Sequence, residues 1–364
     1  MVDRKWRGRW YEPGDEREIL DLRGRVFVTK NIERANLETW RWQFNDNPAG
    51  KGIIRIAADG EEFAGQYAVM PTRFCIMGKE KTMALSCDTM VDPGYQRQGI
   101  FTDLAKDVYE RAEADGIIAV WGFPNENSHH GFIKCLDWFD IAELPIYVRP
   151  LKAAPLAKMA LKNKALGRLA GVAAGMLQPL FFSTPGDAGA EMKTLRIQRE
   201  QSANSDYDEL WERNKYKYKI IQIRDSMYLN WRYFCLAPDA YDLFSIRKSG
   251  ALKGFIVLRR TEFFGVETGV LTEIFPADMT EESLVFAMDF IASYCLGKSC
   301  ALLVSLCSQL KTQEYRKMDF IRIPKKFEPK KFNFGARCER DPELKALMRD
   351  LNNWYVTYGD TDLI

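Results

Sequence analysis

The order of predicted elements repeats once along this chain, with the two copies about 180 to 190 residues apart. In each copy a helical pattern leads to an aromatic-rich segment, Trp40–Pro48 in the first and Trp231–Pro238 in the second. Two strands follow, joined by a turn at Asp59-Gly60 or at Ser249-Gly250. Apolar and polar residues alternate on both sides of these turns, which is typical of a β-hairpin. Because a repeat defines domains better than composition does, the sequence predicts two units of the same fold.

The correspondence continues after the hairpins. LSCDTMVDP, Leu85–Pro93, corresponds to VLTEIFP, Val270–Pro276, and a helical pattern and an apolar strand follow each of them. Each unit therefore reads β-α-β-β-β-α-β-α-β, with an antiparallel start and a parallel pair formed by the crossover helix after Phe101. We expect an α+β protein with two tandem domains, each a mixed sheet flanked by helices. The expected divisions are 1–150 for the first domain, 151–191 for a linker, 192–345 for the second domain and 346–364 for a C-terminal tail.

Composition narrows the class of protein further. The 364 residues are 46% apolar and exceed the usual size of one domain. The 52 basic and 50 acidic side chains leave a net charge of +2, so no global field favours nucleic acid. The eight cysteines form no CxxC pair and there are two histidines, so we expect reduced thiols and no metal site. Without a signal peptide or an apolar run of about 18 residues, a soluble, cytoplasmic protein is expected.

The stretch PGYQRQGIF combines a strand end, a tight turn and a helix N-terminus that is reached through Gly99. The first backbone N–H groups of a helix have no internal partner, and the helix dipole is positive there, so this junction suits an anion. Arg97 adds a charge and Thr102 a hydroxyl. A diphosphate fits this geometry, although an ordinary strand-to-helix connection would use the same residues.

With the helix and the strand IIAVWGF that follow, VDPGYQRQGIF resembles the coenzyme A loop of the GCN5-related N-acetyltransferases (GNAT), whose pattern is Gln/Arg-x-x-Gly-x-Gly/Ala after a Val-x-Pro strand end. The resemblance covers most of residues 10–150 and implies that the loop amides hold the pyrophosphate of CoA. It also implies that the end of the preceding strand pairs with the pantetheine arm and that an Asn after the next strand contacts the cofactor. The residues concerned are Gln96, Arg97, Gln98, Gly99, Ile100, Phe101 and Thr102 in the loop, Thr89, Met90 and Val91 in the strand, and Asn125.

Two positions depart from the family pattern. Phe101 stands where the pattern has its last Gly or Ala, so this side chain must point away from the phosphates or the loop must be wider. The Tyr that often serves as general acid in such enzymes falls at Phe132 or Ile133. Protonation of the leaving thiolate must then come from another group or from water.

The second copy has PADMTEESL in place of PGYQRQGIF. The glycine is absent, and Asp278, Glu281 and Glu282 place negative charge at the helix N-terminus, where carboxylates suit the dipole but repel a diphosphate. We therefore expect the second unit to be a GNAT-like domain that lacks the pyrophosphate loop and binds no cofactor.

Acyl transfer from a thioester to an amine needs a base and a donor to the developing oxyanion. Asp88, just before the loop, is where the family often has an acidic base, although it could instead pair with an arginine such as Arg73. His129 and His130 are further catalytic candidates, since an imidazole can deprotonate an amine. In the alternative, Asn127 or Ser128 caps their helix and the histidines only cover its first turn. The oxyanion donor would be a backbone N–H near Met90.

Two further features have structural and functional interpretations. The aromatic clusters, Trp40, Trp42 and Phe44 in one copy and Trp231, Tyr233 and Phe234 in the other, favour a core role over a stacking platform because both copies have them. The linker predicts a helix from about Pro155 to Gln178. Its basic and apolar composition over 151–185 also suits an acceptor-site lid or contact with anionic lipid, which is not favoured.

The resemblance implies an N-acyltransferase, most plainly an N-acetyltransferase, that uses acetyl-CoA or another acyl-CoA. The acceptor is expected to be a primary amine of a small molecule or aminosugar, bound in the inter-domain cleft, with no nucleic acid partner. Two alternatives stay open: a tRNA-dependent aminoacyl transferase-like enzyme, against which the intact diphosphate loop argues, and a non-catalytic CoA-binding sensor or interaction module.

Overall fold

The computed structural model describes residues 5–27, 36–152, 194–237, 239–263, 265–325 and 331–361. The chain divides into two compact units. The first comprises Met1–Glu143, Tyr218–Ile223 and Phe332–Asn353, and the second comprises Leu144–Lys217, Arg224–Lys331 and Trp354–Ile364. Each unit contains segments from both halves of the chain, whereas the repeat predicted contiguous domains. Most of the linker, including the expected helix 155–178, lies outside the described residues.

The first unit is a mixed sheet with the strand order β1-β2-β3-β4-β5-β15-β6, and β9 pairs with the far end of β3. The expected parallel pair is β4 with β5, joined by α3. The elements are β1 (Arg7–Trp10), α1 (Glu16–Val26), α2 (Leu37–Phe44), β2 (Ile53–Asp59), β3 (Glu62–Ile76), β4 (Lys79–Val91), η2 (Pro93–Tyr95), α3 (Ile100–Ala114), β5 (Val120–Gly122), α4 (Glu126–Cys135), β6 (Phe139–Glu143), β9 (Ile220–Gln222), β15 (Asn333–Arg337), α11 (Pro342–Met348) and η7 (Leu351–Asn353).

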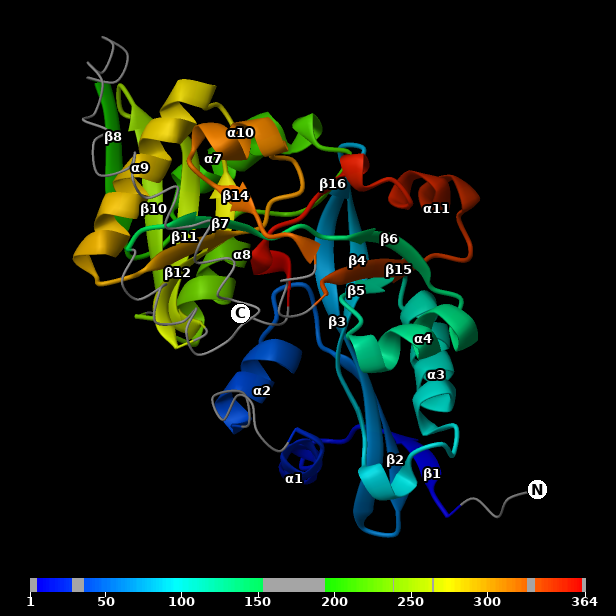
Figure 1. Ribbon diagram of the computed structural model, residues 1–364. Helices are drawn as coiled ribbons and strands as arrows, with labels where there is room; N and C mark the ends of the chain where they lie inside the picture. The colour runs from blue at the N-terminus through cyan, green and yellow to red at the C-terminus, as the bar shows by residue number, and fades with distance from the viewer. Residues whose placement is uncertain are drawn as a thin grey trace. The chain divides into compact units, whose positions relative to one another are not determined.

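Helices cover both faces of this first sheet: α3 and α4 lie on one face, and α1 and α2 on the other (Figure 1). The buried residues of α3 recur at helical spacing, for example Ile100, Leu104 and Val108, and they form one stripe against the sheet. The aromatic residues Trp40 and Phe44 of α2 are buried as well. The expected core role of that cluster is confirmed for these two side chains.

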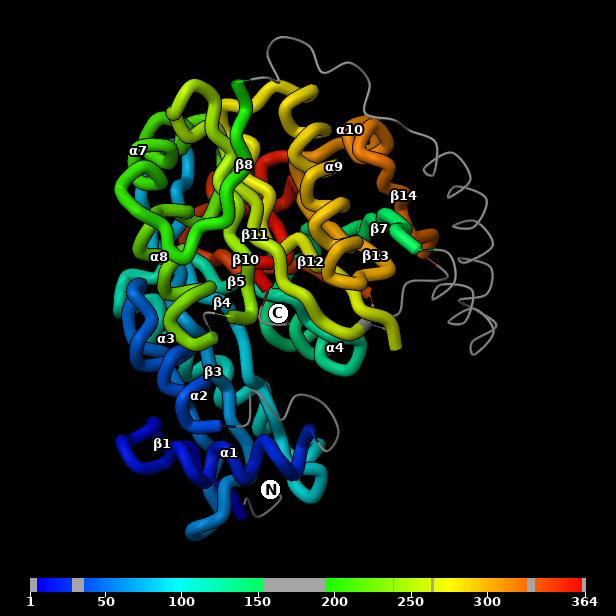
Figure 2. Tube along the Cα trace, turned by 90° about the vertical axis from the view of Figure 1, so that its left-hand side faces the viewer, coloured from blue at the N-terminus to red at the C-terminus, as the bar shows by residue number. Residues whose placement is uncertain are grey.

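The second unit is a mixed sheet with the order β14-β7-β13-β12-β11-β10-β8. The helices α9 and α10 lie on one side of it, and α7 and α8 on the other (Figure 2). Its elements are β7 (Tyr147–Pro150), β8 (Leu195–Glu200), α7 (Ser205–Asn214), η4 (Lys215–Lys217), α8 (Ser226–Asn230), the π-helical turn η5 (Trp231–Cys235), β10 (Tyr241–Lys248), β11 (Ala251–Phe263), β12 (Val266–Phe275), α9 (Glu281–Gly297), β13 (Leu302–Ser305), α10 (Thr312–Lys317), β14 (Ile321–Arg322), β16 (Trp354–Tyr355) and η8 (Tyr358–Asp360). Trp231 and Tyr233 of η5 are buried, as expected for a core role.

A reciprocal exchange of strands explains why the units are not contiguous. β7 follows the first copy in sequence but pairs with β13 and β14 of the second sheet. β15 follows the second copy but pairs with β5 and β6 of the first sheet. Each sheet is thus completed, at the corresponding place, by a strand from the other half of the sequence. Local patterns contain no information about such pairing, so the expected boundary at 150 differs from the observed units.

Among the helices of the described residues, none combines the length and the hydropathy that a membrane span requires. The stretch 151–185, considered above for contact with lipid, is described only at its first two residues. The segment considered as a C-terminal tail is part of the folded protein: Trp354, Tyr355 and Val356 are buried.

Candidate functional site

The connection from β4 to α3 is held by a hydrogen-bonded turn. The Asp92 carboxylate accepts from the Gly94 N–H at 2.9 Å and from Arg25 Nε at 2.8 Å. The hydrogen bond from Arg25 and then that from Gly94 lower the pKa of Asp92. Because Arg25 belongs to α1, this ion pair connects the start of the loop to the helix that covers the other face of the sheet from α3.

The loop then turns through two left-handed residues, Arg97 with φ 63° and Gly99 with φ 81°. Such positions reorient successive backbone N–H groups and are typical of anion-binding concavities. Helix α3 begins at Ile100, and Gly65 of β3 allows it to approach: a Cβ on Gly65 would lie 2.7 Å from Ile100 Cγ2. The predicted strand-to-helix junction is therefore present, with the helix N-terminus packed directly on β3. That its amides bind a diphosphate stays a prediction.

Phe101, which departs from the family pattern, packs into the contact between α3 and α4. Its ring centroid lies 5.1 Å from that of Phe132 and 6.0 Å from that of Tyr67. A Cβ on Gly131 would approach Phe101 Cε1 to 2.8 Å, so the glycine makes room for the ring. Thr102 differs from expectation in one respect. Its hydroxyl donates to the Gly99 carbonyl at 2.9 Å, which commits the proton that we expected to be offered to a ligand.

A β-bulge interrupts β4 immediately before the loop. Gln66 is opposite Met90 and Ala68 is opposite Cys87, so β4 has one residue more than β3 between these pairs. Asp88 lies in the bulge with φ 49°. On its other side β4 pairs with β5 only through Ala84 and Leu85. Within the described residues, the backbone of Asp88–Val91 thus forms no ladder with β5. This edge of β4 would have to be unpaired in this way for a pantetheine arm to pair with it.

Two polar side-chain atoms at the bulge are buried without a hydrogen-bond partner among the described residues, namely Gln66 Oε1 and Thr89 Oγ1. Gln66 is 1% exposed, and its Nε2 donates to the Asp88 carbonyl at 3.0 Å. Buried polar atoms in folded proteins are rarely unpaired. The bulge therefore has two buried polar atoms whose hydrogen-bonding capacity the described residues leave unused.

Asp88 is paired, but not with the arginine considered from the sequence. Its carboxylate forms an ion pair with Arg23 of α1, and the two side chains are 13% and 11% exposed. Arg73 instead pairs with Glu80 at 2.8 Å. The sequence has no signal for the Arg23 contact, because the partners are 65 residues apart and belong to different elements.

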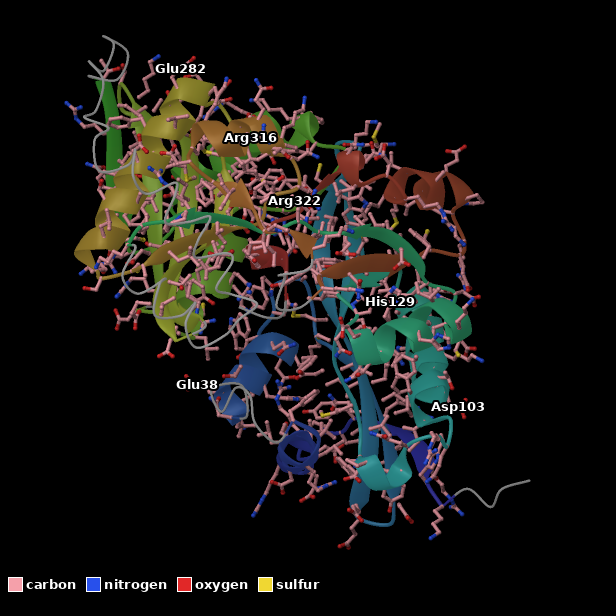
Figure 3. The ribbon with its side chains drawn as sticks, viewed as in Figure 1. Glu38, Asp103, His129, Glu282, Arg316 and Arg322 are labelled. Carbon is pink, nitrogen blue, oxygen red and sulfur yellow. The ribbon has the colours of Figure 1, made fainter. Side chains whose placement is uncertain are left out.

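The histidines lie on α4, as Figure 3 shows for His129. His129 Nε2 lies 2.7 Å from Asp140 Oδ1 of β6, and His130 is exposed. Within the described part of the chain, no hydrogen bond or ion pair joins either histidine to Asp88. The helix cap is Asn125 rather than Asn127 or Ser128: its Oδ1 accepts from both of their N–H groups, at 2.9 and 3.0 Å. Only the Nδ2 group of Asn125 is then left for the predicted contact with a cofactor.

The second unit retains the bulge. Glu273 is opposite Val257 and Leu271 is opposite Leu258, so β12 has one extra residue, at the place that corresponds to the bulge of β4. The parallel pair of β12 with β13 ends at Leu271 and Ser305. Beyond it, the C-terminal segment Trp354–Thr361 contacts β12 and the residues that follow β13: the Tyr355 hydroxyl donates to the Ile274 carbonyl, and Thr357 forms a bridge with Cys307.

This segment is anchored by buried charge. Arg224 and Glu273 are fully buried, and Arg224 contacts Asp360 at 2.6 Å and Glu273 at 3.3 Å. Thr357 Oγ1 donates to Glu273 at 3.1 Å. Burial raises the pKa of Glu273 to about 7, although Arg224 acts in the opposite direction. The protein's own side chains thus fill the place in the second unit that corresponds to the bulge of the first.

The loop of the second unit is also closed by internal contacts. Thr280 caps α9 by accepting from the Ser283 N–H at 3.2 Å. Asp278 pairs with Lys217 at 3.2 Å, and Glu281 pairs with Lys317. That this unit lacks a pyrophosphate loop stays a prediction.

This combination of a bulged strand, a glycine loop and a crossover helix defines the class. Residues 8–138 match the family of the acetyltransferase (GNAT) domain, and they form such a domain. The whole chain is an α+β protein whose two mixed sheets are consistent with two tandem GNAT-like domains. The chain thus contains a domain of the GNAT acetyltransferase type. No curated protein matches it by sequence.

Solved structures share the fold across most of the chain. A GCN5-related N-acetyltransferase from Anabaena variabilis has a TM-score of 0.62 at 10% identity, covering 91% of this chain and 73% of that one. A probable N-acyltransferase from Enterococcus faecalis has a TM-score of 0.61 at 12% identity, covering 92% and 72%. The N-myristoyltransferase of Saccharomyces cerevisiae with bound myristoyl-CoA has a TM-score of 0.56 at 12% identity, covering 90% and 82%.

Proposed function

We propose that this protein is an N-acyltransferase that binds acetyl-CoA or another acyl-CoA in its first unit and transfers the acyl group to a primary amine. The observation that carries the proposal is the bulge of β4, where strand pairing with β5 has ended and two buried polar atoms, Gln66 Oε1 and Thr89 Oγ1, lack partners. This arrangement directly precedes the loop with Gly99 and the N-terminus of α3.

Each part of this site has a role in the proposal. The N–H groups from Gln96 to Thr102, with the Arg97 side chain, would hold the diphosphate. The backbone of Thr89–Val91 would pair with the pantetheine arm, and a backbone N–H beyond that arm would stabilise the oxyanion. Acyl-CoA supplies a thioester, whose carbonyl carbon an amine can attack.

Asp88 is the favoured base, and its ion pair with Arg23 fixes the carboxylate at the bulge. Gln66 Oε1 can accept a hydrogen bond from the amine. His129 and His130 stay weaker candidates, because His129 is already paired with Asp140. The acceptor is proposed to be a small molecule or an aminosugar, and its place in the inter-domain cleft stays a prediction.

The test combines binding and turnover. Calorimetric titration with acetyl-CoA and CoA should show binding, and release of free thiol from acetyl-CoA with a panel of amines and aminosugars should show turnover. Binding without turnover of any amine would favour a CoA sensor. Absence of binding to both CoA and acyl-CoA would contradict the proposal and leave the tRNA-dependent alternative.

A further inference from the structure

A chain of hydrogen bonds crosses the core of the first unit and ends at the point where β4 and β5 separate. Trp138 Nε1 donates to the Tyr109 hydroxyl at 2.8 Å. The hydroxyls of Tyr109 and Tyr67 lie 2.7 Å apart, and that of Tyr67 lies 2.9 Å from Ser86 Oγ. Tyr67 and Tyr109 are buried, at 0% and 2% exposure, whereas Ser86 is half-buried.

The direction of this series of hydrogen bonds follows from which groups can donate. An indole N–H can only donate, so the Tyr109 oxygen accepts from Trp138. The Tyr109 proton then goes to Tyr67, which is its other partner, and the Tyr67 proton goes to Ser86. Every buried hydroxyl is satisfied only in this direction. Burial raises the pKa of both tyrosines, so both stay protonated and keep donating. The Ser86 proton is left for a further acceptor.

Ser86 lies next to the last paired residues of the two parallel strands, Leu85 and Trp121. Gly122 follows on β5, and a Cβ there would lie 3.2 Å from the Ser86 carbonyl oxygen, so the glycine lets β5 approach Ser86 closely. From Val91 at the loop to Ser86 is about 16 Å, five residues at about 3.3 Å each. An extended pantetheine arm that starts at the loop has a similar length.

In the described part of the second unit, the positions that correspond to Ser86 and Tyr67 carry no hydroxyl. Through the matching registers at the two bulges, Ser86 corresponds to Gly269 and Tyr67 to Leu258. A Cβ on Gly269 would lie 2.7 Å from Leu303 and 3.1 Å from Leu258, so apolar side chains occupy this place. The unit whose bulge is not filled by the C-terminal segment thus carries hydroxyls at these two positions, whereas the other has a glycine and a leucine there.

We propose that Ser86 donates a hydrogen bond to the sulfur of CoA in the first unit, and that Tyr67 and Tyr109 are positioning residues that fix the direction of this donor. The inference rests on the proposed function and gives the leaving sulfur a hydrogen-bond donor, while protonation of the thiolate is left to water. In the transfer, the amine nitrogen bonds to the carbonyl carbon, the carbon–sulfur bond breaks, and the sulfur keeps the electron pair. The amine proton passes to the base. Ser86 transfers no proton and only stabilises the sulfur as it becomes a thiolate.

The first experiment compares CoA with desulfo-CoA, which lacks the sulfur, by calorimetry at pH 6 and pH 9.5 for the wild type and Ser86→Ala. A thiolate is the stronger acceptor, so Ser86→Ala should weaken CoA binding about tenfold at pH 9.5 and much less at pH 6. Binding of desulfo-CoA should not change. The matched control is Ser305→Ala, which removes a similar serine–tyrosine contact, 2.9 Å to Tyr315, from the second unit. It should leave all four affinities unchanged.

The second experiment tests the positioning residues. Tyr67→Phe should weaken CoA binding at pH 9.5 about threefold, because the Ser86 proton loses its fixed direction. Ser86→Thr keeps a hydroxyl, so it should bind CoA like the wild type and unlike Ser86→Ala. Equal effects of Ser86→Ala on CoA and desulfo-CoA, or no effect on either, would overturn the inference while the proposed function stands. If the wild type binds neither ligand, both fail together.

Discussion

The two units share one architecture but use the same β-bulge in opposite ways. In the first unit the bulge of β4 leaves Gln66 Oε1 and Thr89 Oγ1 without partners in the described residues. In the second unit the corresponding place is filled by the C-terminal segment and by the ion pairs of Arg224 with Asp360 and Glu273. A repeated fold can thus retain a β-bulge and fill it by packing in one copy. The loops agree with this division, because one has Gly99 and the other has internally paired carboxylates.

Gly99→Asp should have the largest effect on the difference in ligand binding that we expect between the two units. A carboxylate at the N-terminus of α3 would repel a diphosphate, so CoA affinity should fall by more than about 100-fold and turnover should be lost. The matched control is Gly250→Asp in a turn of the second unit, where φ is 85° against 81° at Gly99. It introduces similar backbone strain and should leave CoA binding intact in calorimetry. Equal affinity of Gly99→Asp and the wild type would refute the assignment of the loop.

Arg224→Met, in the second unit, should lower the stability of the protein without changing its affinity for CoA. It leaves the buried carboxylates of Asp360 and Glu273 without a counter-charge, so the free energy of unfolding should fall by about 3–5 kcal/mol. Urea denaturation measures this, and neutralising both carboxylates in the same chain should recover much of the loss. The CoA affinity of the folded variant should be that of the wild type. A loss below about 1 kcal/mol would show that the charged cluster does not anchor the segment.

The pH dependence of stability should report on Glu273. Its pKa is about 7 in the folded protein against 4.5 ordinarily, so between these values the folded state binds more protons than the unfolded state. The contribution of Glu273 is therefore fully present below about pH 4.5 and is lost as the pH rises through about 7, by up to about 3 kcal/mol. The difference in unfolding free energy between the wild type and Glu273→Gln should follow this curve. A difference that is constant from pH 5 to pH 8 would be incompatible with a buried, titrating Glu273.

Phe101→Ala should have the smallest of these effects. Its half-buried ring links α3 to α4 through Phe132, so its removal should cost about 2 kcal/mol of stability. CoA affinity should stay within about threefold, because the ring packs into the core rather than on the loop amides. Thermal unfolding and calorimetry measure the two quantities. A much larger loss of affinity would mean that Phe101 contacts the ligand after all.

The sequence by itself determined the parts that depend on neighbours in the chain. The repeat, the hairpins, the crossover helix after Gly99 and the two unlike loops all follow from local periodicity and turn residues. The tertiary structure decided the rest, because contacts between distant residues have no local signature. Examples are the exchange of β7 and β15, the pairing of Asp88 with Arg23, and the anchoring of Asp360 by Arg224, 136 residues away. Phe101 is a further example. Its departure from the family pattern is visible in the sequence, but only the packing of α3 against α4 shows that Gly131 makes room for its ring.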